Sequence, residues 1–570
     1  MEKWFIAMKK ADFNGIAEKY HISPITARLI RNRDIIGDEE IDFYLNGTIA
    51  DLYDGMLMKD MDRAVDILAE KIREEKRIRI IGDYDIDGVN ATYILQEGLS
   101  GLGADVDTDI PDRIRDGYGL NKMLIDRALD EGVDTIITCD NGIAAADEIA
   151  YGKQNGLTVI VTDHHEVPYI EIGEEKEYIL PPADAVVDPH QPDCGYPFKG
   201  LCGAAVAYKL IEALYNVMQK DPEDVDYLME NVAIATVGDV MDLTGENRIF
   251  VKQGLEMLKC TRNPGLKALI ECTGIHVERL NAYHIGFVIG PCINASGRLD
   301  TAKRALDLLN ARTRRDAVML AEDLKALNDS RKEMTEKGVE EAVRLIENTD
   351  LKDDKVLVVY LPDCHESIAG IIAGRLKEKY YRPVFVLTKS EDGVKGSGRS
   401  IETYDMFAQM CRCRALFTKF GGHKLAAGLS LEEENVQRFR ETINELADLS
   451  DEDLQMKVSI DMQLPFPYIT EQLIHELELL EPFGKGNPRP LFAEKNLRVI
   501  RPAVFGKNRN VLKCRLEDSA GNQMEAVYFG DVEACLAQME KKPVMSFTYY
   551  PAVNEYMGRK TLQLTIVNYQ

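Results

Sequence analysis

Apolar residues in the first half of this chain recur with two periods, one typical of strands and one typical of helices. Strand-like and helix-like runs alternate along the sequence. Because parallel strands need a crossover connection, usually a helix, this alternation predicts a mainly parallel sheet with helices on both faces. Strands are expected at residues 78–81, 105–110, 135–138, 158–162 and 185–187, and helices at 90–102, 124–131 and 144–155.

Helical spacing dominates before and after this alternating region. Residues 1–75 predict a helical segment that leads into the first strand, and residues 203–346 are again mainly helical. A glycine-rich turn is expected at 289–300 within that second region. The densely charged run 317–346 predicts a connecting helix, either single or made of two helices with a bend at 328–330.

A second alternating α/β unit begins at residue 355 and contains a glycine turn, KGSGRS, at 395–400. Short alternating strands separated by turn residues over 499–565 predict a small β-barrel of the oligonucleotide-binding (OB) kind. The chain should therefore hold an N-terminal helical segment (1–75), a first α/β domain (76–300), a connecting helix (301–348), a second α/β domain (349–450) and an OB-like domain (458–570).

Composition fits this division. A chain of 570 residues is too long for one core and predicts three or four domains. Its 45% apolar and 29% charged residues are typical of a soluble globular protein, and no apolar run approaches the length of about 18 residues needed for a membrane span. The eleven cysteines contain no CxxC pair, which favours reduced thiols in the cytoplasm.

Charge is distributed unevenly along the chain. The net charge is −27, yet residues 495–515 contain seven Lys or Arg and no acid, and residues 375–424 contain eleven basic residues against five acidic ones. Two basic segments on an acidic body would guide a polyanion along one route and repel it elsewhere. Two ordinary basic surfaces are the alternative interpretation.

Acidic and histidine residues follow the predicted strands directly. Asp83, Asp85 and Asp87 place three carboxylates within five residues, where they repel one another unless a proton or cation neutralises them. A solvated acidic turn is the alternative interpretation. The carboxyl ends of parallel strands share one edge of the sheet, so these groups should meet there. Carboxylate and imidazole ligands without thiolate favour Mn²⁺ or Mg²⁺, and two such ions would make a hydrolytic phosphoryl site. The candidates are Asp83, Asp85, Asp140, His164 and His165, with Asp239 as a further ligand.

Two neighbouring acids receive other interpretations. Asp163, directly before the histidine pair, is expected to orient its neighbours without binding metal. Asp87 is interpreted as turn chemistry before Gly88. No GxxxxGK[ST] motif supports an ATP-driven motor, and no GxSxG motif supports acyl transfer.

Four motifs in order resemble the metal-site motifs of the DHH phosphoesterase superfamily: DYDIDG at 83–88, CDNG at 139–142, DHH at 163–165 and GDVMDL at 238–243. Within that superfamily the chain resembles the RecJ family of single-stranded-DNA-specific exonucleases. This resemblance covers about residues 50–515 and includes PDRIRDGYGLN, YPFKGLCGAAVAYKL, GPCINASGR, SGRS, GGHKLAAG and EPFGKGNPRPLF.

The resemblance implies a fold and an activity. The fold would be a parallel-sheet DHH domain and a DHH-associated α/β domain joined by a long helix, with an OB-like barrel at the C-terminus. The activity would be a Mn²⁺- or Mg²⁺-dependent exonuclease that digests single-stranded DNA from the 5′ end to mononucleotides during repair and recombination, without ATP. Single-strand-binding protein and a RecQ-type helicase are the partners that the family implies.

The same resemblance assigns metal ligands. Asp83 and Asp140 would hold one ion, and Asp85, Asp140, His164 and Asp239 would hold the other. Many relatives with short substrates have a histidine four residues before the first aspartate, where this chain has Arg79. The first ion is therefore expected to have fewer protein ligands.

Catalytic and substrate-binding candidates complete the assignment. The catalytic candidates are His165, which would face the scissile phosphate, with Asp163 and His423. A guanidinium beside a hydroxyl can bind a terminal phosphate in bidentate fashion, which suggests Ser397 and Arg399 for the 5′-phosphate. Arg113 is expected opposite them, as a third contact to the 5′-phosphate. The remaining strand contacts are expected from Arg298, Lys507, Arg509 and Lys513.

Two other functions remain open on the sequence. A DHH phosphodiesterase for short oligonucleotides or cyclic dinucleotides would share the metal motifs, but it would not need a barrel with a basic strip. A non-catalytic scaffold of the same superfamily would not need the intact acidic set.

Overall fold

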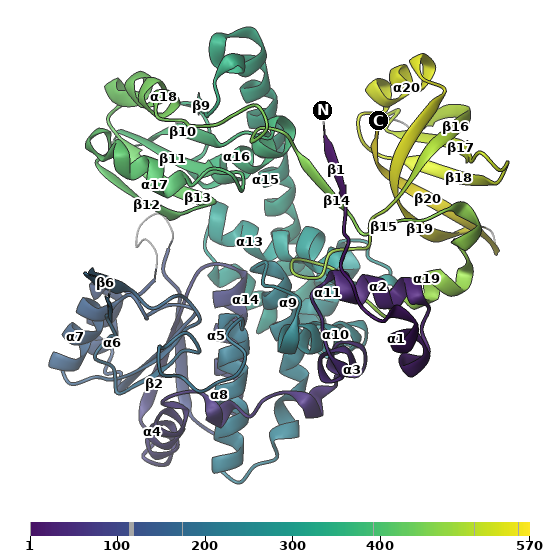
Figure 1. Ribbon diagram of the computed structural model, residues 1–570. Coiled ribbons are helices and arrows are strands. Elements are labelled where there is room, and N and C mark those ends of the chain that lie inside the picture. Colours follow the sequence, from purple (N-terminus) through teal and green to yellow (C-terminus); the bar gives the residue numbers. More distant parts are fainter. Residues whose placement is uncertain (1, 113–118, 174, 391–392, 507, 557) are drawn as a thin grey trace.

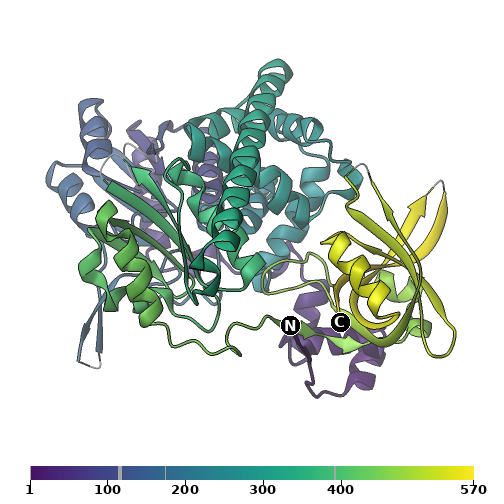
Figure 2. The ribbon, with the colours of Figure 1, turned by 90° about the horizontal axis from the view of Figure 1, so that it is seen from above.

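The computed structural model describes residues 2–112, 119–173, 175–390, 393–506, 508–556 and 558–570. Two α/β domains lie one above the other in Figure 1 and are joined by a long helix, with a barrel to one side. The view from above in Figure 2 shows this helix running along the middle of the molecule. Among the described residues, no helix combines the length and the apolar character that crossing a bilayer requires.

The first domain contains the predicted parallel sheet. Its five strands are ordered β3-β2-β4-β5-β8 and every neighbouring pair is parallel. Successive side chains of a strand point to opposite faces, so Ile80 packs under one helical layer and Ile81 under the other. The strands are β2 (Arg77–Gly82), β3 (Asp105–Asp109), β4 (Thr135–Cys139), β5 (Thr158–Thr162) and β8 (Ala185–Val187).

Helices cover both faces of this sheet, as the alternating pattern predicts. One face carries α4 (Met61–Arg73), α5 (Ile86–Gly101) and α8 (Gly203–Val217), which bury the largest apolar core. The other face carries α6 (Lys122–Asp130) and α7 (Ala146–Gln154). A small exposed hairpin, β6 (Tyr169–Ile172) and β7 (Glu175–Tyr178), follows β5.

The turn expected at 289–300 is wrong, because this segment is helical. Residues 282–299 form one continuous rod: α12 (Ala282–His284), a π-helical turn (Ile285–Ile289) and α13 (Gly290–Leu299). Pro291 stands in the first turn of α13, where a proline is tolerated. Gly297 is there for close packing, since a Cβ at this position would lie 2.3 Å from the Tyr84 carbonyl oxygen.

In the described part of the chain, four further helices complete the first domain, and a fifth joins it to the second domain. They are α9 (Met229–Gly238), α10 (Gly245–Lys259), α11 (Pro264–Cys272) and α14 (Lys303–Leu309). The two possibilities for the charged run are decided in favour of a single helix, α15 (Arg314–Asn348), of 35 residues. Its buried side chains face α11 and α13 at one end and α16 (Glu366–Tyr380) at the other.

The second domain is a five-stranded mixed sheet with the order β12-β13-β11-β10-β9. The expected glycine turn at 395–400 is wrong, because most of it belongs to strand β11. Its glycines lie where a side chain has no room: a Cβ on Gly396 would meet Leu387 at 2.3 Å. The elements are β9 (Leu357–Tyr360), β10 (Val384–Ser390), β11 (Gly393–Arg399), β12 (Lys419–His423), β13 (Ala426–Leu431), α17 (Met406–Arg412) and α18 (Val436–Glu445).

The C-terminal region is the expected β-barrel. Strands β16 to β20 pair around the barrel, and β16 also pairs with β19, which closes it. Helix α20 (Val532–Lys541) packs on it, and α19 (Glu471–Glu478) precedes it. The strands are β16 (Phe492–Phe505), β17 (Val511–Glu517), β18 (Gln523–Tyr528), β19 (Val544–Tyr556) and β20 (Arg559–Tyr569).

The N-terminal segment is only partly as expected. It begins with a strand, β1 (Lys3–Ile6), that pairs in parallel with β14 (Lys457–Ile460) before the barrel. Its helices α1 (Phe13–Tyr20), α2 (Pro24–Asn32) and α3 (Asp38–Asn46) share a core with the barrel. Figure 1 shows both chain ends on the barrel side of the molecule.

Candidate metal centre

The predicted acidic residues stand together because their strands end at one edge. Asp83 follows β2, Asp140 follows β4 and Asp163 follows β5. Asp85 caps α5, where its Oδ1 accepts hydrogen bonds from the backbone N–H groups of Asp87 (2.9 Å) and Gly88 (3.1 Å). The edge that carries these residues faces the second domain in Figure 1.

The backbone at this edge is tightly constrained. A Cβ on Gly88 would lie 2.4 Å from the Asp83 carbonyl oxygen, so only glycine permits this turn. Asp140 adopts a left-handed conformation with φ of 59°, which is uncommon outside glycine but best tolerated by Asn and Asp. Backbone strain of this kind concentrates at functional sites and holds the Asp140 carboxylate in one direction.

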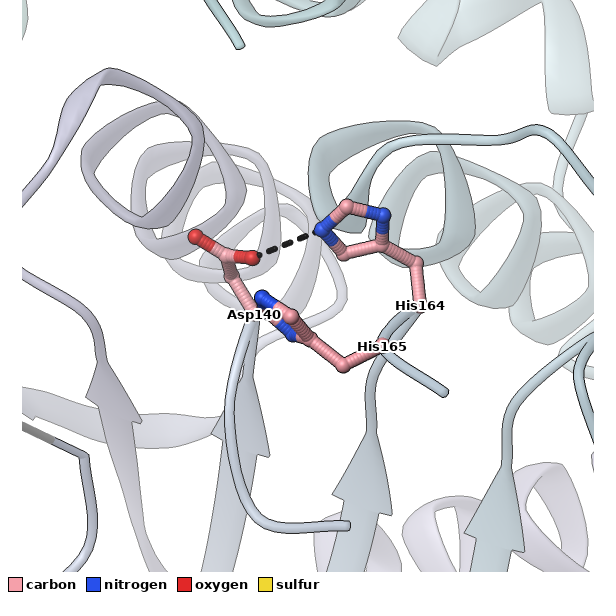
Figure 3. Close-up of side chains that lie close together, drawn as sticks. All are labelled: Asp140, His164 and His165. Atoms are coloured by element: carbon pink, nitrogen blue, oxygen red, sulfur yellow. Dashed lines mark hydrogen bonds and ion pairs between the residues drawn. The ribbon is translucent and has the colours of Figure 1, made fainter. Parts of the chain in front are cut away.

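The carboxylates and imidazoles converge into three overlapping groups whose ligand atoms lie within 4.8 Å of one another. His164 Nε2 lies 3.1 Å from Asp140 Oδ1, 3.5 Å from Asp87 Oδ2 and 3.9 Å from Asp239 Oδ2. Figure 3 shows Asp140 directed at the His164 ring, with the His165 ring beside it. The groups are Asp83 with Asp85 and Asp140, Asp87 with His164 and Asp239, and Asp140 with His164 and His165.

Asp163 has the geometry expected of an orienting residue. Its Oδ1 accepts hydrogen bonds from His165 Nδ1 (2.7 Å) and from the His164 backbone N–H (2.7 Å), while Oδ2 accepts from the Ile143 backbone N–H (2.9 Å). Burial disfavours a charged His165, but the Asp163 carboxylate outweighs it and raises the pKa of His165 to about 9.

Burial and mutual repulsion perturb the other carboxyl groups. Burial raises the pKa of Asp140 well above its ordinary range, and the charges of Asp87 and Asp85 raise it further. Burial raises the pKa of Asp239 to about 8, again with help from these two acids. Mutually repelling carboxylates are stabilised by positive charge, and carboxylate oxygens are the ligands that Mn²⁺ and Mg²⁺ prefer, so the residues present fit a divalent cation.

Comparison with known proteins identifies the family. Three family models match: the DHH family, N-terminal domain at residues 77–236, the DHHA1 domain at 353–448 and the RecJ OB domain at 460–568. The single-stranded-DNA-specific exonuclease RecJ of Bacillus subtilis is 35% identical over 99% of this chain and 70% of its own length. The chain belongs to the RecJ family. RecJ of Escherichia coli is 33% identical over 96% of both chains.

Solved structures of RecJ proteins share the fold. The crystal structure of RecJ from Thermus thermophilus in complex with Mn²⁺ superposes with a TM-score of 0.84 at 29% identity, covering 100% of this chain and 79% of that one. A structure of exonuclease RecJ bound to manganese gives a TM-score of 0.59 at 33% identity, over 69% of this chain and 96% of that one.

Asp87 is the residue of this RecJ-family site that the sequence interpretation missed. Its side chain is fully buried, and its two oxygens accept hydrogen bonds from the backbone N–H groups of Gly203 (2.6 Å) and Ala204 (2.7 Å) at the start of α8. It therefore joins two elements behind the metal-binding edge, in addition to approaching His164. Its place before a glycine at a helix start suggested only turn chemistry.

Arg79, the departure from the relatives with short substrates, points into an ion-pair network. Its Nε lies 2.6 Å from Asp107 Oδ1, and its Nη2 lies 2.6 Å from Glu131 Oε2. Its charge is therefore paired on the β3 side of the sheet, and it contributes nothing to the carboxylate cluster.

The second domain supplies the other predicted residues. Ser397 and Arg399 project from the same face of β11 toward α16, where a Cβ on Gly370 would lie 3.0 Å from Arg399 Nη2. Arg298, at the end of α13, donates from Nη1 to the Ser367 carbonyl oxygen (3.1 Å) and so bridges the domains. His423 lies exposed at the end of β12.

The basic strip lies on the barrel. Arg509 and Lys513 are exposed, and Lys513 Nζ stands 5.5 Å from the centre of the half-exposed Phe505 ring. A cation beside an exposed aromatic ring suits contact with both phosphate and base. Two further predicted residues, Arg113 and Lys507, lie outside the described residues.

Proposed function

We propose that this chain is a metal-dependent exonuclease that removes 5′-mononucleotides from the 5′ end of single-stranded DNA, in DNA repair and recombination. The observation that carries the proposal is the convergence of Asp83, Asp85, Asp140, His164 and Asp239 at one sheet edge opposite the second domain. Similarity over nearly the whole chain to single-stranded-DNA-specific exonucleases supports the substrate class.

The proposed cofactor is Mn²⁺ or Mg²⁺. Asp83, Asp85 and Asp140, whose ligand atoms form one group, would hold one ion. His164 and Asp239, which form another group with Asp87, would hold the other ion, and Asp140, 3.1 Å from His164, would be shared between the two. This grouping puts Asp85 on the first ion, whereas the resemblance alone put it on the second. Bound ions of this kind lower the pKa of water and stabilise charge on phosphoryl oxygens.

His165 is the proposed contact to the scissile phosphate. Its ring lies beside His164, and its side chain is 45% exposed, so it is more accessible to a substrate than the buried ligands. Asp163 binds its Nδ1 and favours the imidazolium, whose positive charge suits a phosphate oxygen. Asp163 is therefore a positioning residue in this proposal.

The second domain would recognise the 5′ end. Ser397 and Arg399 on β11 and Arg298 on α13 approach one another near the first turn of α16. A hydroxyl and two guanidinium groups suit a terminal phosphate, and Arg113 is proposed as a fourth contact. His423, exposed at the end of β12, would contact the same DNA strand.

Two rival functions from the sequence are less well supported. A phosphodiesterase for very short substrates would not need the closed barrel with exposed Arg509 and Lys513. A scaffold would not need the acidic cluster, whose members raise one another's pKa.

Single-stranded DNA is the proposed partner. A cytoplasmic site of action is consistent with eleven cysteines that are all free of disulfides. Single-strand-binding protein and a RecQ-type helicase are further expected from the family.

A comparison of single-stranded and duplex DNA as substrates tests this function. With Mn²⁺, we expect the protein to degrade a long single strand and to leave the matching blunt duplex intact, and we expect EDTA to stop the reaction. The Asp140→Asn variant serves as the control for contaminating nuclease. Equal cutting of duplex and single strand, or cutting restricted to dinucleotides, would contradict the proposal.

A further inference from the structure

A large groove begins next to the metal centre and runs toward the barrel. It encloses about 960 Å³. Val237, Gly238 and Val240 line its inner end, on either side of the metal candidate Asp239. Tyr283 and Phe287 also line the groove, as does the segment 481–485 that precedes the barrel. A strand leaving the metal centre along this groove would pass between the first domain and the barrel.

An aromatic pair stands exposed in this groove. The rings of Tyr283 and Phe287 stack with centroids 4.9 Å apart and planes inclined by 26°. Their side chains are 62% and 66% exposed, unusual for a large apolar pair on one surface. Exposed flat rings are the feature that single-strand-binding surfaces use to stack bases without regard to sequence.

The same helical rod connects this pair to the metal loop. Phe287 lies in the π-helical turn that precedes α13, and Asn294 in α13 accepts a hydrogen bond from the Ile86 backbone N–H (2.9 Å), next to Asp85. Arg298 lies at the far end of the rod, against the second domain. The rod therefore passes the proposed 5′-phosphate site, the metal loop and the aromatic pair in that order.

The π-helical turn has a local cause and a consequence. Pro291 has no N–H to donate to the preceding turn, and the Gly290 N–H instead bonds to the Ile285 carbonyl oxygen, five residues back. Turns of this type are rare and often occur at functional sites. From Phe287 to Arg298 is about 16 Å along a helix, which at about 3.4 Å per stacked nucleotide is no more than about five nucleotides.

Charge in the groove is nearly balanced. Lys252, Lys259, Lys485 and Arg489 line it, but so do Glu256, Glu478 and Glu481. Lys259 and Lys485 are already paired with acids, Glu256 at 2.6 Å and Asp242 at 3.4 Å. Phosphate attraction is therefore weak here, and stacking must supply most of the binding free energy.

We infer that Tyr283 and Phe287 form a platform that stacks bases of the single strand on the 3′ side of the scissile phosphate, within the first five or so nucleotides. This inference rests on the proposed nuclease function and adds a specific role to two residues. It makes binding depend on strand length beyond the nucleotides that the metal centre itself touches.

Length dependence tests the platform. Stacking is worth about 1–3 kcal/mol per base, so Phe287→Ala should weaken the binding of a twenty-nucleotide strand about 5- to 150-fold. Cleavage of a 5′-phosphorylated dinucleotide, too short to reach the platform, should not change. Because stacking releases no counterions, the salt dependence of binding should also stay as in the wild type. Tyr283→Ala should act in the same direction.

Phe529→Ala is the matched control, since Phe529 is 61% exposed but lies outside the groove. It should leave strand binding unchanged. The platform would be overturned if Phe287→Ala reduced cleavage of the dinucleotide as much as it reduced binding of the long strand. Unchanged binding of the long strand by this variant would also overturn it. Absence of nuclease activity on every single strand would instead contradict the proposed function.

Abasic scanning provides an independent readout. Removing single bases at positions two to six from the 5′ end should weaken binding to the wild-type protein at one or two of these positions. Removing the same base should not further weaken the binding of the strand to the Phe287→Ala variant, because that variant has already lost the stacking contact. Additive losses would place the base elsewhere and refute the assignment.

Discussion

Asp239→Asn should make the metal-free protein more stable and the metal-loaded protein less stable. Burial and neighbouring carboxylates raise the pKa of Asp239 from 3.8 to about 8 in the folded chain. Below pH 4 both folded and unfolded chains hold the proton, so this group does not affect stability. Between pH 4 and 8 the unfolded chain loses the proton first, and the folded state becomes progressively less favourable.

The size of the effect follows from this window. At pH 7 the unfolded group has been ionised for about three pH units while the folded group still holds its proton, which corresponds to about 4 kcal/mol at 1.36 kcal/mol per unit. The side chain is 32% exposed, so solvent screens part of this penalty and about 2 kcal/mol is a better expectation. Asparagine cannot ionise, and the variant therefore avoids the penalty in EDTA.

Divalent cations should reverse the order. A ligand that binds only the folded state adds about 2.7 kcal/mol at one hundred times its Kd. Wild-type protein gains this stabilisation, while the variant has lost a proposed ligand. Thermal unfolding midpoints, measured at one scan rate from pH 5 to 8 with EDTA or Mn²⁺, test both halves of the prediction. Asp242→Asn is the control, because Asp242 pairs with Lys485 at 3.4 Å.

Two results would refute this reasoning. If Asp239→Asn is less stable than wild type in EDTA at pH 7, the carboxylate is not held in a repulsive cluster. If Mn²⁺ raises the unfolding midpoint of both proteins equally, Asp239 is not a ligand.

Three further predictions concern hydrolysis and DNA binding. Asp140→Asn should lower the rate of DNA hydrolysis about a thousandfold or more, because the several kcal/mol supplied by a bound ion act on the chemical step. The affinity for single-stranded DNA should change little, and a parallel loss of affinity in a filter-binding assay would contradict this prediction. Arg399→Lys should reduce the preference for a 5′-phosphate about 10- to 100-fold in competition assays, since lysine cannot replace a bidentate contact. An unchanged preference would exclude Arg399 as a contact to the 5′-phosphate. Replacing both Arg509 and Lys513 by Ala should lower the salt slope of binding by about 1.4, at about 0.7 per phosphate contact on a single strand; an identical slope would remove the strip from the DNA path.

The metal-binding edge was predictable because it follows from a local rule. Each of Asp83, Asp140 and Asp163 stands directly after an apolar strand, and parallel strands bring their carboxyl ends together. The fold class and the barrel follow from the same periodicities. Asp239 was harder, since it follows a helix: an acid directly after an apolar run made it only a further candidate, and the resemblance to known motifs then assigned it to one of the two ions.

Other features depend on contacts that periodicity cannot reveal. Residues 290–299 look like a turn because they contain glycine and proline, yet Gly297 serves close packing against Tyr84 and Pro291 is placed where a helix tolerates it. Strand β1 forms only by pairing with β14, about 450 residues later in the chain. The stacked pair of Tyr283 and Phe287 has ordinary helical spacing, and its exposure in the groove is visible only in the folded chain.

The most direct test of the account is the first product released from a long single strand that carries a label on its 5′ or its 3′ terminal nucleotide. With Mn²⁺, the 5′-labelled strand should yield labelled mononucleotide at once, and the 3′ label should appear in mononucleotide only at the end of degradation. Early release of the 3′ label as mononucleotide, or labelled oligonucleotides of mixed length from the 5′-labelled strand, would contradict a 5′-to-3′ exonuclease centred on Asp140.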